Sequence, residues 1–245
     1  MDDTKQTLFI SPPFGNYFFP TIDGVKTIKG SYTLNPRYGL FSQIVKTLRY
    51  SMNDKGWINK IGLKNPGLIY GIHHYNHHKD ILSIAILDKE EVEPILGILP
   101  VDTNIELNVS CPNLNKNLND NGIEKFINPK REWCIVKLSP LTSRSIIENY
   151  YNMGFRQFHC SNTLPTLTGG LSGPILVPYV CNLIQIIQKY PDTVIIAGGG
   201  IQNIDTLQKY KSLGAHHFSI STLFFHPLKT IFFFKEYMSK KIESD

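Results

Sequence analysis

The feature that most constrains the fold is a regular alternation of short β-rich runs with amphipathic stretches, which begins near residue 80. Such alternation predicts parallel strands joined by crossover helices. Two further β-rich runs lie upstream and bring the number of predicted strands to eight. The predicted strands cover residues 7–10, 24–28, 81–86, 104–109, 133–138, 155–160, 193–197 and 215–220.

Eight parallel strands predict an α/β fold, a closed (β/α)8 TIM barrel with functional groups where the strands end. Helices are expected at residues 89–99, 122–127, 142–153, 178–190 and 203–213. Cap or stop residues such as Asp88, Gly154 and Gly214 flank them. The segment 11–23 is too short and too rich in Pro for a full helix, so we expect an irregular first β/α unit. No linker or repeat divides the chain, and residues 1–245 are expected to form one domain.

Composition narrows the class of protein. A chain of 245 residues with 42% hydrophobic content can build one large core. The net charge is +5, but the basic residues are spread along the chain, which is not the pattern of a nucleic-acid-binding surface. No apolar run reaches the roughly 18 residues that span a bilayer, and the four Cys show no metal or redox spacing. We therefore expect a soluble cytoplasmic protein that binds neither nucleic acid nor membrane.

The segment 108–113, Asn-Val-Ser-Cys-Pro-Asn, directly follows the apolar run 105–107. It places the Cys111 thiol between the side chains of Asn108 and Asn113 at a strand end. A thiol can act as a base or nucleophile, and amides offer donors and acceptors to a planar polar ligand. The alternative is a turn in which Ser, Pro and Asn have only a conformational role.

Other predicted strand ends also carry polar or glycine-rich segments. Lys137 lies in the fifth strand, and Ser-Asn-Thr at 161–163 follows the sixth. Glycine-rich loops at 169–173 and 197–200 precede a polar segment at 219–222. Because barrels often bind phosphate after strands seven and eight, this order favours a phosphate-bearing cofactor.

Three remaining features have simpler interpretations. The segments 29–37 and 57–67 read as long loops, which are usually functional in a compact domain. The His-rich run 73–78 lacks carboxylate or Cys companions at ligand spacing, so we expect a solvated loop and no metal site. The aromatic run 232–234 predicts a terminal helix that packs on the barrel.

Together these residues resemble the dihydroorotate dehydrogenases, FMN-containing barrel enzymes of pyrimidine biosynthesis. The resemblance covers most of the chain and is carried by several ordered motifs. They are Asn-x-Ser-Cys-Pro-Asn at 108–113, Asn-x-x-Gly-Leu-x-Asn-x-Gly at 59–67, Val-Lys-Leu at 136–138, Asn-Thr at 162–163, and the loops Gly-Gly-Leu-Ser-Gly at 169–173 and Gly-Gly-Gly-Ile at 198–201.

The resemblance implies a role for each matching residue. The pyrimidine and its carboxylate would be held by Asn59, Asn108, Asn113, Asn162 and Thr163. The flavin would be contacted by Lys29 and Lys137, and its phosphate surrounded by Gly170, Gly173, Gly199, Gly200, Ser221 and Thr222. Cys at position 111 resembles the soluble class, since the membrane-associated class has Ser there. Family members commonly dimerise, so a homodimer is possible.

The implied reaction is oxidation of dihydroorotate to orotate. The substrate loses a proton from C5 to a base, here Cys111, and a hydride from C6 to flavin N5, so base and flavin lie on opposite faces of the ring. Lys137 would stabilise negative charge on the reduced flavin. The acceptor that reoxidises the flavin stays open between fumarate, NAD through an iron–sulfur partner, and quinone.

The chain also departs from the family pattern. Only five residues separate Thr163 from Gly169, where relatives carry an insertion, and Ser221 stands where a Gly usually precedes the phosphate-contacting Thr. Two alternatives therefore stay open. One is an FMN oxidoreductase acting on another dihydropyrimidine or on dihydrouridine in RNA, and the other is a shortened, non-catalytic barrel that serves as a binding partner.

Overall fold

A closed barrel of eight parallel strands forms the centre of the molecule in the computed structural model, which describes residues 6–109 and 122–242. Its strands follow one another around the barrel in the order β1-β12-β11-β8-β7-β6-β5-β2. They are β1 (Leu8–Ile10), β2 (Val25–Tyr32), β5 (Asp80–Ala85), β6 (Ile105–Asn108), β7 (Cys134–Leu138), β8 (Gln157–Cys160), β11 (Val194–Gly198) and β12 (His217–Ile220). All eight predicted strands are present, and the prediction of a TIM barrel is confirmed.

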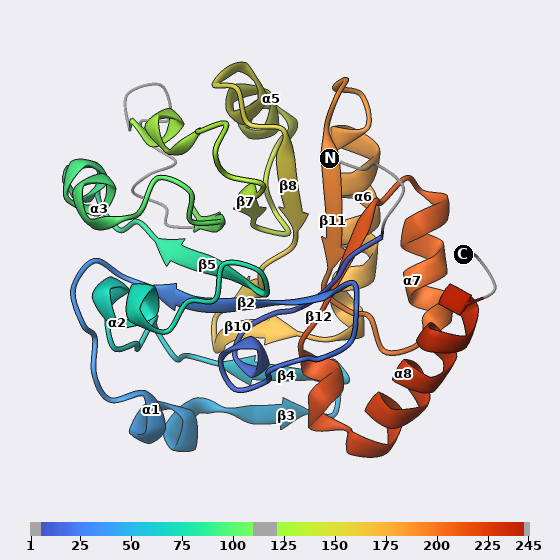
Figure 1. The fold of residues 1–245 in the computed structure, drawn as a ribbon. Coiled ribbons are helices and arrows are strands. Elements are labelled where there is room, and N and C mark those ends of the chain that lie inside the picture. Colours follow the sequence, from blue (N-terminus) through green and yellow to red (C-terminus); the bar gives the residue numbers. More distant parts are fainter. Residues whose placement is uncertain (1–5, 110–121, 243–245) are drawn as a thin grey trace.

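Helices cover the outside of the barrel (Figure 1). They are α2 (Leu68–His73), α3 (Val92–Ile98), α5 (Arg144–Asn152), α6 (Val177–Ile187), α7 (Ile204–Ser212) and α8 (Pro227–Ile242). A further helix, α1 (Leu40–Thr47), contacts β4 (Gly56–Asn59), a strand outside the barrel. Single 3-10 turns are η1 (Phe14–Asn16), η2 (Lys89–Glu91), η4 (Ile123–Phe126), η5 (Pro174–Leu176) and η6 (Thr222–Phe225). Of the described helices, none combines the length and the apolar character needed to cross a bilayer.

Local sequence explains where several helices begin. The Ser143 hydroxyl accepts a hydrogen bond from the Ile146 N–H at the start of α5, and Asn203 does the same for Thr206 at the start of α7. The predicted helix at 122–127 is only the 3-10 turn η4. Between β1 and β2 the described chain forms η1 and no α-helix, as the Pro-rich sequence indicates.

Strand alternation divides the core into two clusters. Inside the barrel, Phe9, Ile28, Ile81, Trp133, Ile135 and Ile196 pack together. The opposite faces of the strands pack against the helices. In α8, Phe233 is buried while Phe232 is 67% exposed. Only some of the side chains of the aromatic run therefore pack against the core.

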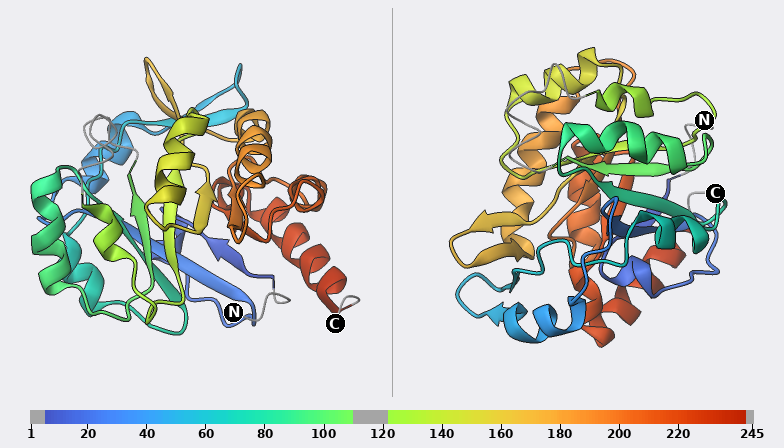
Figure 2. Two further views of the ribbon diagram at one scale, coloured as in Figure 1. Left: turned by 90° about the horizontal axis from the view of Figure 1, so that it is seen from above. Right: turned by 90° about the vertical axis from the view of Figure 1, so that its left-hand side faces the viewer.

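A second, four-stranded sheet was not predicted from the sequence. It has the order β3-β4-β10-β9, with β3 (Arg49–Ser51), β4 (Gly56–Asn59), β9 (Leu164–Thr166) and β10 (Gly169–Ser172). Both hairpins project beyond one end of the barrel (Figure 2). Because β9 follows β8 after a few residues, this is the end where the barrel strands finish.

Candidate functional site

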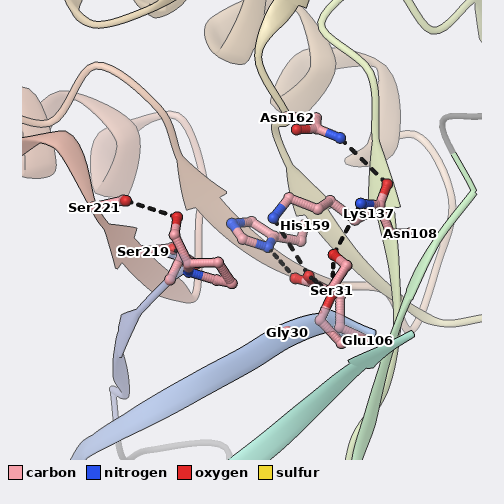
Figure 3. A network of polar contacts seen from close by, with 12 residues as sticks. Gly30, Ser31, Glu106, Asn108, Lys137, His159, Asn162, Ser219 and Ser221 are labelled. Carbon is pink, nitrogen blue, oxygen red and sulfur yellow. Dashed lines mark hydrogen bonds and ion pairs between the residues drawn. The ribbon is translucent and has the colours of Figure 1, made fainter. Parts of the chain in front are cut away.

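Polar side chains from three neighbouring strands meet at the carboxyl end of the barrel (Figure 3). Asn108 of β6 pairs in register with Lys137 of β7, and Lys137 pairs with His159 of β8. The Asn162 amide, just beyond β8, donates from Nδ2 to Asn108 Oδ1 at 3.2 Å. Three residues singled out from the sequence, Asn108, Lys137 and Asn162, therefore lie together as expected.

The carboxylate of Glu106 lies at the centre of this cluster and is fully buried. Ser83 Oγ donates to Oε1 at 2.8 Å, Lys137 Nζ lies 3.3 Å from the same oxygen, and His159 Nδ1 lies 2.5 Å from Oε2. Burial alone would raise the pKa of Glu106, but the positive charge of Lys137 and the electrostatic interaction with His159, together with hydrogen bonds from His159 and Ser83, lower it to about 2. Glu106 is therefore ionised at neutral pH.

His159 forms the second buried partner of Glu106. Burial lowers the pKa of its imidazole and outweighs the opposite effect of the Glu106 charge. A neutral ring whose Nδ1–H donates to the carboxylate satisfies both groups. On its far side the ring reaches β11, where a Cβ on Gly198 would lie 2.6 Å from Nε2. His159 thus fills the barrel beneath the polar cluster.

The small sheet brings a second group of predicted residues together. Asn59 pairs with Gly170 across β4 and β10. A Cβ on Gly170 would lie 2.4 Å from Thr163 Oγ1, so only glycine permits this approach. Asn59, Thr163 and Gly170 consequently adjoin at the same barrel end as Asn162.

A third group consists of the two glycine-rich loops. Gly200 has a φ of 81°, and a Cβ there would lie 2.7 Å from Val177 Cγ2 and 3.2 Å from Gly173 O. The loop after β11 therefore packs directly on the segment that begins η5 and α6. Beside it, Gln202 Nε2 lies 3.4 Å from Thr222 Oγ1, and Ser221 Oγ donates to Pro12 O at 2.8 Å.

Lys29 is not brought to this cluster. Its Nζ lies 2.9 Å from Asp80 Oδ2 and 3.3 Å from His74 O, and it sits 4.9 Å from the centre of the Phe19 ring. The physical reason is strand alternation, because Ile28 points into the barrel and Lys29 points outward. A register shift after Lys29 then turns Ser31 inward, where it contacts Ser83.

Two predicted residues, Cys111 and Asn113, lie outside the described residues. The His-rich run ends α2 and enters the following loop, and nowhere in the described ranges do three His, Cys, Asp or Glu side chains gather in a group that could hold a metal ion.

The family model for dihydroorotate dehydrogenase matches residues 23–235, which is most of the chain. The chain belongs to the dihydroorotate dehydrogenase family.

Curated relatives agree with this family assignment. The catalytic subunit of dihydroorotate dehydrogenase B (NAD(+)) from Staphylococcus carnosus is 27% identical over 223 residues, which cover 78% of this chain and 72% of that protein. The corresponding subunit from Malacoplasma penetrans is 27% identical and covers 85% of this chain and 79% of its own length. Among solved structures, dihydroorotate dehydrogenase from Eimeria tenella in complex with ferulenol has a TM-score of 0.64 at 17% identity, covering 84% of this chain and 70% of that one, a likeness of fold.

Dihydroorotate dehydrogenases are generally flavoproteins, and the glycine loops are the part of this barrel that could hold the phosphate of a flavin. Gly199 and Gly200 both adopt positive φ, which turns consecutive peptide units of the loop. Within the described part of the chain, neither their N–H groups nor that of Thr222 donates to another residue. Backbone donors beside small residues at the ends of the last two strands suit a phosphate, and the residues present fit the group.

Four residues of this cluster were not predicted from the sequence, namely Glu106, His159, Ser31 and Ser83. A signal for two of them was present, because Glu106 lies between Ile105 and Leu107 and His159 lies between Phe158 and Cys160. A polar residue flanked by apolar ones in a barrel strand points to the interior. Its partner there depends on the register of the neighbouring strands.

Proposed function

We propose that this protein is a dihydroorotate dehydrogenase that oxidises dihydroorotate to orotate in pyrimidine biosynthesis with FMN as cofactor. The observation that carries the proposal is the meeting of Asn108, Lys137 and Asn162 at the barrel end that also holds the glycine loops. Amides suited to a planar polar ligand and a cradle suited to a phosphate thus lie at one end of one barrel.

Five residues are assigned to the substrate. Asn108 and Asn162 are buried or half-buried and joined to each other, so their amide groups are held in place rather than free to rotate in solvent. Asn59 and Thr163 adjoin through Gly170 on the small sheet. With Asn113, these side chains would bind the pyrimidine ring and its carboxylate.

The cofactor residues fall into two groups. Gly170, Gly173, Gly199, Gly200, Ser221 and Thr222 would surround the FMN phosphate. Lys137 would lie near the ring, where FMN, when bound, supplies a hydride acceptor. Lys29 is left out of this assignment because its amine is paired with Asp80 on the outer face of the barrel.

Two side chains act on the reaction itself. Cys111 would remove the proton from C5 of dihydroorotate as the general base. Lys137 would hold a fixed positive charge close to where negative charge develops, and Glu106 keeps that amine in place at 3.3 Å. Because Glu106 is buried, the amine is held without competition from bulk water.

The deciding experiment is the visible absorption spectrum of the purified holoprotein before and after anaerobic addition of dihydroorotate. We expect an oxidised flavin spectrum that bleaches on addition. If the flavin stays oxidised with dihydroorotate but bleaches with another dihydropyrimidine, that other compound is the substrate. A protein that takes up no FMN on reconstitution would contradict the proposal.

Cys111→Ala tests the base. We expect this variant to bind FMN with unchanged affinity and to lose at least about 10²-fold in the rate of flavin reduction by dihydroorotate, the range typical for loss of a general base. Stopped-flow absorbance measures this rate directly. Cys134→Ala, which alters a thiol in β7 that hydrogen-bonds Phe126 O, is the control and should keep the rate. An unchanged rate in Cys111→Ala would exclude the thiol as base.

A further inference from the structure

A continuous chain of hydrogen bonds joins the proposed substrate-binding amides to the buried carboxylate of Glu106 (Figure 3). Asn162 Nδ2 donates to Asn108 Oδ1 at 3.2 Å, and Asn108 Nδ2 donates to Ser31 Oγ at 3.0 Å. Ser31 Oγ lies 2.8 Å from Ser83 Oγ, and Ser83 Oγ lies 2.8 Å from Glu106 Oε1. The chain crosses four strand segments, from the end of β8 to the interior of β6.

The carboxylate determines the direction of the links from Ser83 to Asn108. An ionised carboxylate only accepts hydrogen bonds, so Ser83 must donate its one proton to Glu106. Ser83 can then only accept from Ser31, which must in turn accept from the Nδ2 group of Asn108. The oxygen of Asn108 is thereby turned toward Asn162, which donates to it. The Asn162 amide is itself oriented by the Thr163 N–H, which donates to Asn162 Oδ1 at 2.9 Å.

The reverse arrangement is unfavourable. If the Asn108 amide were flipped, Ser31 would donate to it, and Ser83 would donate to Ser31. The Ser83 oxygen would then face Glu106 Oε1 with lone pair against lone pair. Because Ser83 and Glu106 are both fully buried, no bulk water relieves that contact.

Glu106 can serve as this fixed end because it is itself held on both oxygens. Lys137 approaches Oε1 at 3.3 Å and His159 approaches Oε2 at 2.5 Å. The carboxylate cannot rotate without losing one of these partners. Its negative charge is balanced by Lys137, so the anion is stable in the barrel interior.

We propose that Glu106 is a positioning residue that, through Ser83 and Ser31, fixes which end of the Asn108 amide faces the substrate. The proposal rests on the proposed function, in which these two amides bind the pyrimidine. It extends that function by assigning the selection of donor and acceptor groups in the binding site to a carboxylate that does not touch the substrate. The same carboxylate holds Lys137, so one buried charge orders both the substrate side and the flavin side.

Ser31→Ala and Ser83→Ala test this directly, since each cuts the chain while leaving the pair of Glu106 and Lys137 in place. We expect the dissociation constant of orotate for the oxidised holoenzyme to rise about tenfold in each variant, the effect of one misdirected buried hydrogen bond. The double variant should bind orotate no more weakly than the single variant with the lower affinity, because both substitutions cut the same chain. Titration of the flavin absorbance with orotate measures these constants.

Thr27→Val is the matched control. Like Ser83, Thr27 carries a buried hydroxyl that hydrogen-bonds a buried carboxylate, that of Asp80, but it lies in β2 on the outer face of the barrel. It should lower stability to a similar extent and leave the orotate dissociation constant within about twofold, well below the tenfold effect expected from the chain. Glu106→Gln should raise the constant at least as far as the serine variants, since a neutral amide no longer demands a donor from Ser83.

A second readout needs neither flavin nor substrate. In ¹⁵N-labelled protein without cofactor, the side-chain amide protons of Asn108, assigned by their loss in Asn108→Asp, should exchange with solvent about tenfold faster in Ser31→Ala and Ser83→Ala than in Thr27→Val, as expected on loss of one hydrogen bond. Unchanged exchange together with unchanged orotate binding in the serine variants would overturn the inference and leave the proposed function intact. Failure of the unaltered holoenzyme to bind orotate would overturn the proposed function, and the inference with it.

Discussion

Two buried lysines, only three strands apart around the barrel, have different partners. Lys29 is paired with Asp80 at 2.9 Å on the outer face, and Lys137 with Glu106 at 3.3 Å in the interior. The family resemblance assigns both amines to the flavin, but only Lys137 joins the polar cluster. The difference follows from strand alternation, which sends neighbouring inward and outward side chains into separate environments.

Replacing each lysine in turn should have different effects, because the two amines lie in different environments. Lys29→Met leaves Asp80 buried without its cation, so we expect a loss of about 3 kcal/mol in the free energy of unfolding and an unchanged affinity for FMN. Lys137→Met should slow flavin reduction by dihydroorotate at least about 10²-fold. Urea unfolding and FMN titration measure the first variant, and stopped-flow absorbance the second. Loss of FMN from a fully stable Lys29→Met protein would show that this amine reaches the flavin.

Glu106 also gives the fold a dependence on pH with a definite sign. Its pKa in the folded protein is about 2, below the ordinary value of 4.5, so the unfolded chain binds more protons between these values. Its contribution to stability is complete above about pH 4.5 and is lost as pH falls toward about 2. His159, whose pKa is also lowered, adds a loss of the same sign as pH falls below its ordinary value.

Acid unfolding of Glu106→Gln checks this dependence. The variant should be less stable at neutral pH, and its free energy of unfolding should fall less steeply than that of the unaltered protein between about pH 4.5 and about 2. Urea titrations at a series of pH values give the two slopes. Equal slopes would mean that folding does not lower the pKa of Glu106.

At the scale of elements, the loop after β11 depends on glycine for two separate reasons. Gly200 needs a positive φ of 81°, and its place against Val177 leaves no room for a Cβ. The loop is thereby pressed onto the beginning of α6, which sets where its backbone N–H groups lie.

Gly200→Ala should therefore cost about 1 to 2 kcal/mol of stability from the backbone alone and weaken FMN binding about tenfold or more as the loop shifts. Thermal unfolding and FMN titration measure both effects. Gly97→Ala is the control, because Gly97 lies exposed in α3 with no atom within 4 Å of an added Cβ. That variant should gain roughly 0.5 to 1 kcal/mol and bind FMN normally. Equal FMN affinity in both variants would contradict the phosphate assignment.

The elements also show where sequence-based prediction succeeds and where it ends. The eight barrel strands could be predicted because each is a short β-rich run and most of them alternate with helices. The small sheet could not, since β4 and β10 lie more than 100 residues apart in the chain and their pairing depends on a fold already formed. Its strands contain Gly, Pro and Ser, which are typical of loops.

At the scale of the whole molecule, prediction of the site from the sequence is limited in the same way, because contacts between distant segments depend on the fold. The convergence of Asn108, Lys137 and Asn162 follows from the order of the strands, because the carboxyl ends of parallel strands meet at one end. The charge network beneath them does not follow from order alone. Whether Glu106 meets Lys137 and His159 depends on the register of β6, β7 and β8, which the sequence of any one strand leaves open.

Closure of the barrel has a consequence for how the chain is made. Strand β1 completes its pairing only with β12, and Leu8 lies opposite Phe218. At about 5 to 20 residues per second, a ribosome needs roughly 10 to 40 s to supply this partner. During that time one edge of β1 has no native neighbour, so nascent chains depend on avoiding wrong pairing until β12 has been synthesised.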